Sequence, residues 1–354
     1  MPPRALGPAL AFGASAAFLF PMNLPRFVRA LLAPAFLSAT ALAADFAPAI
    51  IYDMGGKFDK SFNQSASDGT TKFKKDTGIE VREFEVTNAA QREQAMTRFA
   101  QRGSQIIVAI GFSQASAVEA AAKKFPYVKF AIIDGTVNLP NVQSINFREN
   151  ESSFLCGMAA ALASKTGKVG FVGGMDIPLI RKFARGYADG AKFVNPSVEV
   201  YQNMTGTTAA AWNDPTKGSE LAKSQIGRGA DVIFHASGNT GGGVMQAAKD
   251  AGKLSIGCDS NQNYLHPGKV LTSMMKRVDN AVYDAFTQGE MLETGFNVMG
   301  VSNDGVGYAL DEFNAELVSA EMQAAVDAAA ASMTAGDLMV HDYTSDESCP
   351  ALDF

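Results

Sequence analysis

Short apolar runs alternate with longer amphipathic stretches along most of the chain after Asp45. Short apolar runs are typical of buried strands in a parallel sheet, and stretches with helical apolar spacing are typical of helices packed on its faces. In the first half of the chain this pattern predicts helices that include Gln64–Thr77 and Gln91–Arg102. It predicts strands at Ala49–Tyr52, Val81–Glu85, Gln105–Ile110, Lys129–Ile133 and Gln143–Asn146.

The same alternation begins again in the second half. The predicted strands there are Lys168–Val172, Glu199–Asn203, Asp231–His235 and Ser255–Gly257. The predicted helices are Ile180–Phe193, Pro215–Arg228 and Gly242–Ala251. Strands that alternate with helices indicate an α/β fold with parallel sheets. Two such halves predict two lobes with a cleft between them, and clefts of this kind are favoured ligand sites.

The N-terminal region has the composition of an export signal. Arg26 and Arg29 precede the apolar run 30–43, which is too short for a stable membrane anchor. Ala41 and Ala43 supply the small residues that a signal peptidase needs. We therefore expect residues 1–44 to be a signal peptide, with Met22 as a possible start, and the mature protein to be a soluble periplasmic monomer.

A membrane anchor is the alternative for this region, because a second apolar stretch covers residues 6–20. Pro21 and the two arginines interrupt the combined apolar region, which favours export. No cysteine lies at the expected cleavage site, so a lipid anchor is not indicated. No segment after residue 45 is long and apolar enough to span a bilayer.

Composition excludes several classes of function. The 354 residues carry a formal net charge of −6 and have no basic run, which disfavours nucleic-acid binding. The three cysteines and three histidines are scattered along the chain. Neither a zinc site nor a disulfide framework is therefore predicted.

The loop after the first predicted strand carries the most informative chemistry. Asp53 ends the strand, two glycines follow, and Phe62 and Asn63 lie where a helix begins. Ligands of open parallel sheets bind outside the carboxyl ends of the strands. This loop would hold an acceptor, a flat apolar face and an amide at such a place, which suits a flat ligand. The alternative is an ordinary loop with Ser61 as the helix N-cap.

Glycines follow the first predicted strand of the second half. Gly173 and Gly174 permit a tight turn and a close backbone approach. Leu179, which follows them, faces either the cleft or its own helix. We expect Gly186 and Gly190, further along that helix, to be packing contacts.

Two further loops of the second half have the composition of a cleft wall. Trp212 is the only tryptophan, and it lies either in the core or at the cleft as a binding platform. Its position just before a predicted helix favours the platform. The glycine-rich segment 236–243 lacks the lysine of a phosphate-binding P-loop. Gly238 and its neighbours are therefore predicted to line the cleft with backbone donors.

A carboxylate and an ammonium complete the set of candidates. Asp259 ends a predicted strand, and Lys276 follows further along the chain. Together they can clamp vicinal hydroxyls, because the carboxylate accepts the hydroxyl protons and the ammonium donates to the oxygens. The alternative is a structural salt bridge between the two.

With these segments in hand, the chain resembles the basic membrane protein family of ABC-transporter solute-binding proteins, of the purine nucleoside receptor type. The segments that carry the resemblance are Asp53 with Asp59–Asn63, Ser144–Phe154, Gly173–Pro178, Gly238 with Thr240 and Gly241, Asp259 with Ser260 and Gln262, and Thr272–Met274 with Lys276 and Asp279. In combination they are specific, although none is specific alone.

The resemblance implies a type I periplasmic binding protein: two Rossmann-like lobes, a ligand cleft and a three-stranded hinge. We expect 45–150 with 275–295 to form the N-terminal lobe and 151–274 with 296–320 the C-terminal lobe. The remainder, 321–354, would be a C-terminal helix and tail.

The resemblance also implies roles for single residues. Asp53 would recognise the base, with Phe62 and Asn63 beside it, and Trp212 would be the second stacking aromatic. Asp259 and Lys276 would clamp the ribose. Phe112, Leu179 and Gly238 complete the expected ligand-binding set. Departures from the family pattern at Trp212, Cys258 and Asn261 leave the choice of base open.

The resulting hypothesis is an exported solute-binding protein that delivers a nucleoside, and more specifically a purine nucleoside, to an inner-membrane ABC permease. It would have no cofactor, metal or catalytic activity. A free base, a pentose or a furanose signal in the same fold is the first alternative. A nucleoside hydrolase or phosphorylase is the second, although the histidines and acids form neither a metal cluster nor a phosphate site.

Overall fold

The computed structural model describes residues 46–352. The expected signal peptide, its cleavage site and the possible start at Met22 lie outside these residues. None of the helices in the described part of the chain is long and apolar enough to cross a membrane.

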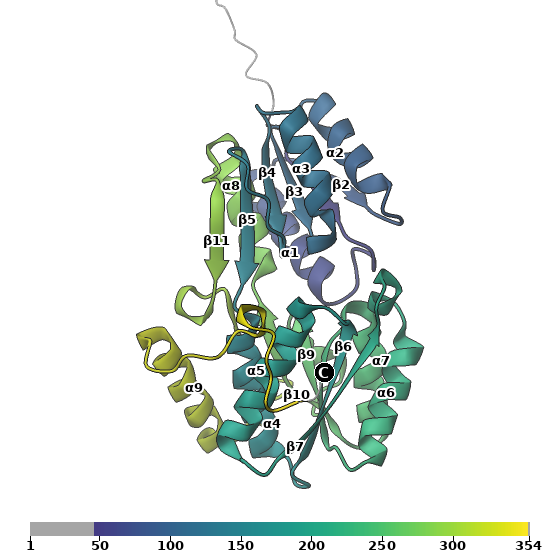
Figure 1. Cartoon of the computed structure of the whole chain (residues 1–354), viewed down its shortest axis with the longest axis vertical. Helices are drawn as coiled ribbons and strands as arrows, with labels where there is room; N and C mark the ends of the chain where they lie inside the picture. The colour runs from purple at the N-terminus through teal and green to yellow at the C-terminus, as the bar shows by residue number, and fades with distance from the viewer. Residues whose placement is uncertain (1–45, 353–354) are drawn as a thin grey trace, which may run out of the picture. The chain divides into compact units, whose positions relative to one another are not determined.

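The first lobe is built on a six-stranded parallel sheet with the strand order β11-β5-β4-β3-β1-β2 (Figure 1). Its strands are β1 (Ala49–Tyr52), β2 (Arg82–Glu85), β3 (Ile106–Ile110), β4 (Lys129–Ile133), β5 (Val142–Phe147) and β11 (Gly295–Met299). Alternate residues of the central strands enter different apolar clusters, as expected of a sheet covered on both faces. Helices α1 (Phe62–Thr77) and α8 (Val278–Gln288) cover one face, and α2 (Gln91–Gln101) and α3 (Ala115–Lys124) cover the other.

The second lobe repeats this plan with the strand order β12-β10-β9-β8-β6-β7. Its strands are β6 (Lys168–Met175), β7 (Glu199–Gly206), β8 (Val232–Ala236), β9 (Leu254–Asp259), β10 (Val270–Lys276) and the antiparallel edge strand β12 (Val306–Tyr308). One face packs against α4 (Glu149–Ala163) and α5 (Pro178–Val194), and α9 (Ala320–Ala335) packs on α4. The other face packs against α6 (Pro215–Gly227) and α7 (Gly241–Asp250).

The chain passes between the lobes three times, from β5 to α4, from β10 to α8 and from β11 to β12. The third passage lies later than the expected boundary at residue 295, because β11 pairs with β5 of the first sheet through Met299. This edge strand leaves Phe296 and Val298 exposed. Its sequence therefore lacks the buried apolar run that identifies the central strands.

Most predicted elements are present, with ends shifted by a few residues. One expected turn is absent, and one long helix was missed. Gly173 and Gly174 do not form a turn, since β6 continues through them to Met175. Helix α4 was not predicted at all, although it is the helix most extensively packed against α5. Phe154–Ala160 of α4 are all buried, so its sequence shows no polar face and hence no amphipathic period.

Close packing of α4 on α5 depends on glycine, as expected for Gly186 and Gly190. A Cβ atom at Gly186 would lie 2.3 Å from the carbonyl oxygen of Asn150. A Cβ atom at Gly190 would lie 2.0 Å from that of Phe154. The prediction that these glycines are packing contacts is confirmed.

Candidate functional site

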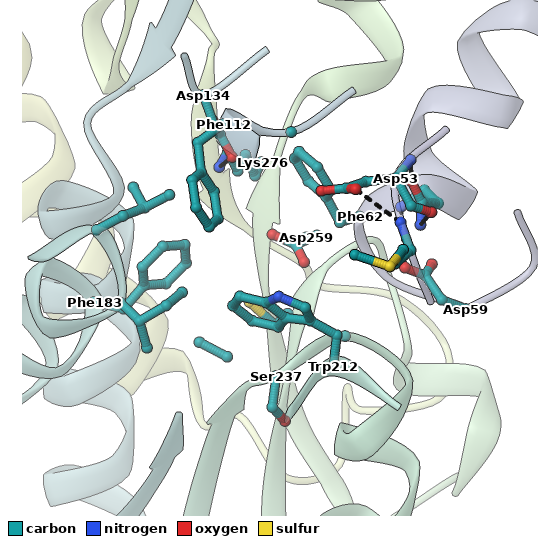
Figure 2. A pocket seen from close by; sticks show the side chains of 18 residues that line it. Asp53, Asp59, Phe62, Phe112, Asp134, Phe183, Trp212, Ser237, Asp259 and Lys276 are labelled. Carbon is teal, nitrogen blue, oxygen red and sulfur yellow. Dashed lines mark hydrogen bonds and ion pairs between the residues drawn. The ribbon is translucent and has the colours of Figure 1, made fainter. Parts of the chain in front are cut away.

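A cavity between the two lobes is lined by every residue of the predicted ligand-binding set (Figure 2). The cavity contains about 600 Å³ of space free of protein atoms, a volume that includes its opening to solvent. The predicted residues on its wall are Asp53, Phe62, Asn63, Phe112, Leu179, Trp212, Gly238, Asp259 and Lys276. Sequence reasoning did not place several other lining residues there, among them Asp59, Asp134 and Phe183.

Asp53 lies just after β1 and is held entirely by the first lobe. Its Oδ1 accepts from the backbone N–H of Met54 at 2.8 Å and from Arg92 at 3.1 Å. Its Oδ2 accepts from the hydroxyl of Ser113 at 2.6 Å. The side chain of Asn63 bonds both the N–H and the C=O of Asp53. Asn63 thus shapes the loop, and the carboxylate of Asp53 has a fixed orientation at this end of the cavity.

The N-terminus of α1 is capped by Asp59 rather than by Ser61. The carboxylate of Asp59 accepts from the backbone N–H groups of Ser61, Asn63 and Gln64 at 2.9, 3.1 and 3.0 Å. Burial raises the pKa of Asp59 to about 6, although these bonds act in the opposite direction. Ser61 does occupy the N-cap position, as the alternative for this loop had it, but its side chain makes no capping bond, and its hydroxyl instead donates to Asp259 of the second lobe.

Trp212 lies at the cavity wall, which decides between the two positions considered for it. Figure 2 shows its ring between Phe183 on one side and the Asp53 loop on the other. The ring packs over Gly174 of β6, where a Cβ atom would lie 2.1 Å from its Cζ3 atom. The close approach to the backbone that was predicted at this glycine is therefore made by the Trp212 ring.

Lys276 is the best buried charge of the site, with 1% of its surface exposed. Its Nζ lies 2.6 Å from Oδ2 of Asp134 and 2.8 Å from Oε1 of Glu149. The rings of Phe62 and Phe147 lie 5.1 and 5.0 Å from the same nitrogen. Burial acts to lower the pKa of Lys276, but the nearby carboxylates outweigh it and raise this pKa above its usual value.

Asp259 and Lys276 do not form the structural salt bridge considered as the alternative to a clamp. Within residues 46–352, no ion pair of 4.0 Å or less joins them. Asp259 instead accepts from the Ser61 hydroxyl at 2.5 Å. Burial raises the pKa of Asp259, and Lys276 opposes this effect. Both side chains line the cavity, and each is held by a different partner: Asp259 by Ser61, and Lys276 by Asp134.

Asp134 is the most important residue that sequence reasoning missed. It follows β4 directly, so the rule that identified Asp53 and Asp259 at strand ends also applies to it. Its backbone has a φ of 62°, a left-handed conformation that aspartate tolerates better than most residues. Its Oδ1 is buried and has no hydrogen-bond partner in the described protein. This oxygen can therefore accept a hydrogen bond from a bound ligand.

The glycine-rich loop after β8 forms part of the cavity wall, as expected. Gly238 has a φ of 58° and lines the cavity together with Ser237. Behind this loop, burial lowers the pKa of His235 to about 4, and its Nε2 lies 2.9 Å from Oε1 of Gln262. In the described part of the chain, no group of three His, Cys, Asp or Glu side chains is placed to hold a metal ion. Cys156, Cys258 and Cys349 are free thiols.

Loops of the two lobes contact each other beside the cavity. The hydroxyl of Ser260 donates to the backbone carbonyl of Ser61 at 2.8 Å. Nε2 of Gln262 donates to the carbonyl of Lys60, also at 2.8 Å. Together with the bond from Ser61 to Asp259, these contacts join the loop before α1 to the loop after β9. The cavity is thus walled by both lobes at once.

Residues 48–333 match the family model of the ABC transporter substrate-binding protein PnrA-like family. The chain belongs to this family. Its similarity to a Listeria monocytogenes protein described as a CD4+ T-cell-stimulating antigen is 34% identity, over 84% of this chain and 88% of the relative. It is also 34% identical to the ABC transporter nucleoside-binding protein BmpA of Lactococcus lactis, over 80% of this chain and 87% of the relative.

Solved structures confirm the fold. A solute-binding protein of an ABC transporter system from Aeropyrum pernix superposes with a TM-score of 0.77 at 26% identity, covering 84% of this chain and 93% of that one. A LacI transcriptional regulator from a Rhodococcus species superposes with a TM-score of 0.58 at 12% identity, which shows the shared fold alone. The predicted α/β fold of the type I periplasmic binding proteins and the family resemblance are both confirmed.

Proposed function

We propose that this PnrA-like protein binds a nucleoside, specifically a purine nucleoside, between its lobes and delivers it to an inner-membrane ABC permease. One observation carries the proposal. Residues that were selected from the sequence for base and ribose recognition come from both lobes and line a single cavity. The name of the Lactococcus lactis relative, a nucleoside-binding protein, supports the same ligand class.

The end of the cavity near Asp53 suits the base. A base presents two flat apolar faces and a polar edge, so it requires aromatic neighbours and a fixed acceptor. Phe62 comes from the first lobe and Trp212 from the second, so an aromatic side chain of each lobe is available for stacking. Each such contact contributes ~1–3 kcal/mol in base-binding proteins. The carboxylate of Asp53 is the acceptor for the edge.

The end near Lys276 suits the ribose. Vicinal hydroxyls require acceptors for two protons and a donor for their oxygens. Asp259 and the unpartnered Oδ1 of Asp134 are the acceptors, and the ammonium of Lys276 is the donor. The combination favours a ribonucleoside over a free base, a pentose or a furanose signal, because those smaller ligands would leave one end of the cavity unused.

The same geometry supports the proposal of delivery to a permease. Ligand bound to both lobes stabilises the state in which they are close together, and that state is what a permease can recognise. In this proposal the protein performs no catalysis. A nucleoside hydrolase or phosphorylase would convert inosine to free hypoxanthine, which chromatography after incubation detects.

Thermal-shift measurements on the refolded mature chain, beginning near Asp45, test the ligand class. Guanosine, inosine or adenosine should raise the melting temperature by mass action, and ribose or a free base should do so weakly. If ribose alone gave the full shift, the ligand would be a sugar. If no nucleoside gave a shift, the proposed function would be wrong.

A further inference from the structure

Four buried or half-buried charges form a chain that begins in the ligand cavity and ends in the C-terminal segment. Glu149 is completely buried at the start of α4, and its two oxygens face different lysines. Oε1 lies 2.8 Å from Nζ of Lys276, and Oε2 lies 2.7 Å from Nζ of Lys182. Lys182 lies 3.7 Å from Oδ2 of Asp342 and donates to the carbonyl of Phe147 at 2.9 Å.

The second lysine, Lys182, balances charge that Lys276 alone would leave unbalanced. Two carboxylates, Asp134 and Glu149, face the one ammonium of Lys276. A buried charge without a counter-charge is strongly destabilising, so the excess negative charge needs a second cation. Lys182, with 7% of its surface exposed, supplies that cation to Glu149.

The same arrangement fixes where Lys276 points. An ammonium has three N–H donors. Within residues 46–352, Asp134 and Glu149 are the two oxygens paired with it, and both lie on the hinge side, next to the passage from β5 to α4. The bond to Asp134 occupies one donor, and the close ion pair with Glu149 does not have hydrogen-bond geometry, so N–H donors remain available to the cavity that Lys276 lines.

The outermost member of the chain comes from a part of the protein beyond the family match, which ends at residue 333. We call residues 337–352 the C-terminal strap. It is tied to α4 by the bond from Asn150 to the carbonyl of Val340, at 2.9 Å, and to α5 by the bond from Arg185 to Ser348. Asp342 and Lys182 line a second cavity that shares Phe112, Asp134 and Leu179 with the first. The strap therefore borders the ligand site.

We propose that Glu149 and Lys182 are positioning residues for ligand binding, and that Asp342 of the strap anchors them. Glu149 orients the ammonium of Lys276 towards a ligand hydroxyl, and Lys182 keeps Glu149 ionised and extended between the two lysines. This inference rests on the proposed function and adds residues that do not touch the ligand. It also makes the strap a determinant of sugar recognition.

Calorimetry with guanosine and 2′-deoxyguanosine tests this role on the mature chain. Glu149→Gln keeps the shape and removes the charge, so we expect guanosine to bind about tenfold more weakly. We expect 2′-deoxyguanosine to lose much less, so that the preference for the ribonucleoside falls. If the two ligands lost affinity equally, the role would be structural only and the inference would be overturned.

Asp342→Asn is the milder variant, and Asp346→Asn is its matched control. Both remove one carboxylate from the strap, but Asp346 bonds to His341 at 2.8 Å and is not part of the charge chain. We expect the preference for guanosine to fall about twofold in Asp342→Asn, since a half-exposed pair contributes little, and to be unchanged in Asp346→Asn. If both variants changed the preference for guanosine over 2′-deoxyguanosine to the same extent, the C-terminal strap would have no role in sugar recognition.

A ligand-free measurement separates this inference from the proposed function. Nuclear magnetic resonance of ¹⁵N-labelled lysine ammonium groups detects those that are buried and held by partners. Wild type should show the Lys276 signal, assigned by its absence in Lys276→Met. Glu149→Gln should weaken or remove it, and Asp346→Asn should not. An unchanged signal in Glu149→Gln would overturn the positioning role. Failure of wild type to bind any nucleoside would overturn the proposed function, and a weakened Lys276 signal in Glu149→Gln would then still show that Glu149 holds the ammonium.

Discussion

The two ends of the cavity are built in different ways. At the base end, Asp53 is held by Arg92, Ser113 and Asn63, which all belong to the first lobe. At the sugar end, Lys276 belongs to β10 of the second sheet and pairs with Asp134 of the first lobe, while Asp259 of the second lobe pairs with Ser61 of the first. The acceptor at the base end is thus held within one lobe, although Trp212 of the second lobe borders it, whereas the polar groups of the sugar end are held only where both lobes meet.

This difference has a thermodynamic consequence. Groups that are pre-formed in one lobe contribute affinity without requiring closure. Groups that come together at closure couple ligand binding to the conformation that the permease recognises. We therefore expect substitutions at the sugar end to weaken binding strongly, and substitutions that only loosen the base end to have smaller effects.

The largest effect should come from Lys276→Met. The substitution leaves the carboxylates of Asp134 and Glu149 buried with one cation fewer, and breaking such a cluster costs ~3–5 kcal/mol of stability. Thermal unfolding should show this loss, and calorimetry should detect no nucleoside binding. Lys72→Met, on the exposed face of α1, is the matched control and should leave both measurements unchanged. Tight nucleoside binding by Lys276→Met would show that Lys276 does not contribute to ligand binding.

Asp259→Asn should have the next largest effect. It keeps the shape of the side chain but removes a charged acceptor, which costs ~1.5–3 kcal/mol of binding free energy to guanosine. Calorimetry measures the loss, and thermal unfolding without ligand checks the fold. A lower melting temperature with unchanged guanosine affinity would mean that Asp259 serves only the contact with Ser61.

Trp212→Ala should cost ~1–3 kcal/mol of binding free energy if the ring stacks on the base. Tyr127→Ala is a suitable control, since this aromatic side chain is 75% exposed and does not line the cavity. The loss in Trp212→Ala should be equal for ribonucleosides and 2′-deoxynucleosides, because stacking on the base does not involve the 2′-hydroxyl. If Trp212→Ala bound the nucleoside as tightly as wild type, the ring would serve only protein packing.

Arg92→Leu should have the smallest effect. Arg92 orients Asp53, but both side chains are slightly exposed and Ser113 still donates to the carboxylate. Pairs of this kind contribute up to ~1 kcal/mol. Competition calorimetry between guanosine, inosine and adenosine should show a change in preference among the bases rather than a general loss. A loss as large as that of Asp259→Asn would contradict the comparison between the two ends.

The sequence predicted the site better where the chemistry follows a strand. Asp53 and Asp259 were identified because each ends a buried strand, and the same rule would have identified Asp134. Glu149 could not be found in this way, since it opens a helix whose buried sequence hides its period. Arg92 and Lys182 lie inside helices with ordinary polar neighbours, so only tertiary packing brings them to the site.

The fold was predictable for a similar reason. Most central strands are continuous apolar runs, which the pattern identifies directly. The central strand β10 was not predicted, because Thr272 and Ser273 interrupt its apolar run. The edge strand β11 escaped because it exposes Phe296 and Val298 and is recognised only by its pairing with β5. The boundary between the lobes depends on this pairing, so the expected boundary at residue 295 lies too early.

The sugar end carries the central claim, and the affinity ratio of guanosine to 2′-deoxyguanosine on wild-type protein tests it most directly. A site built to bond a hydroxyl rejects the analogue that lacks it, because its buried polar groups are left without partners. We expect calorimetry to show 2′-deoxyguanosine binding at least about tenfold more weakly than guanosine. Equal affinities would contradict the clamp of Asp259, Asp134 and Lys276, and with it the division of the cavity into a base end and a sugar end.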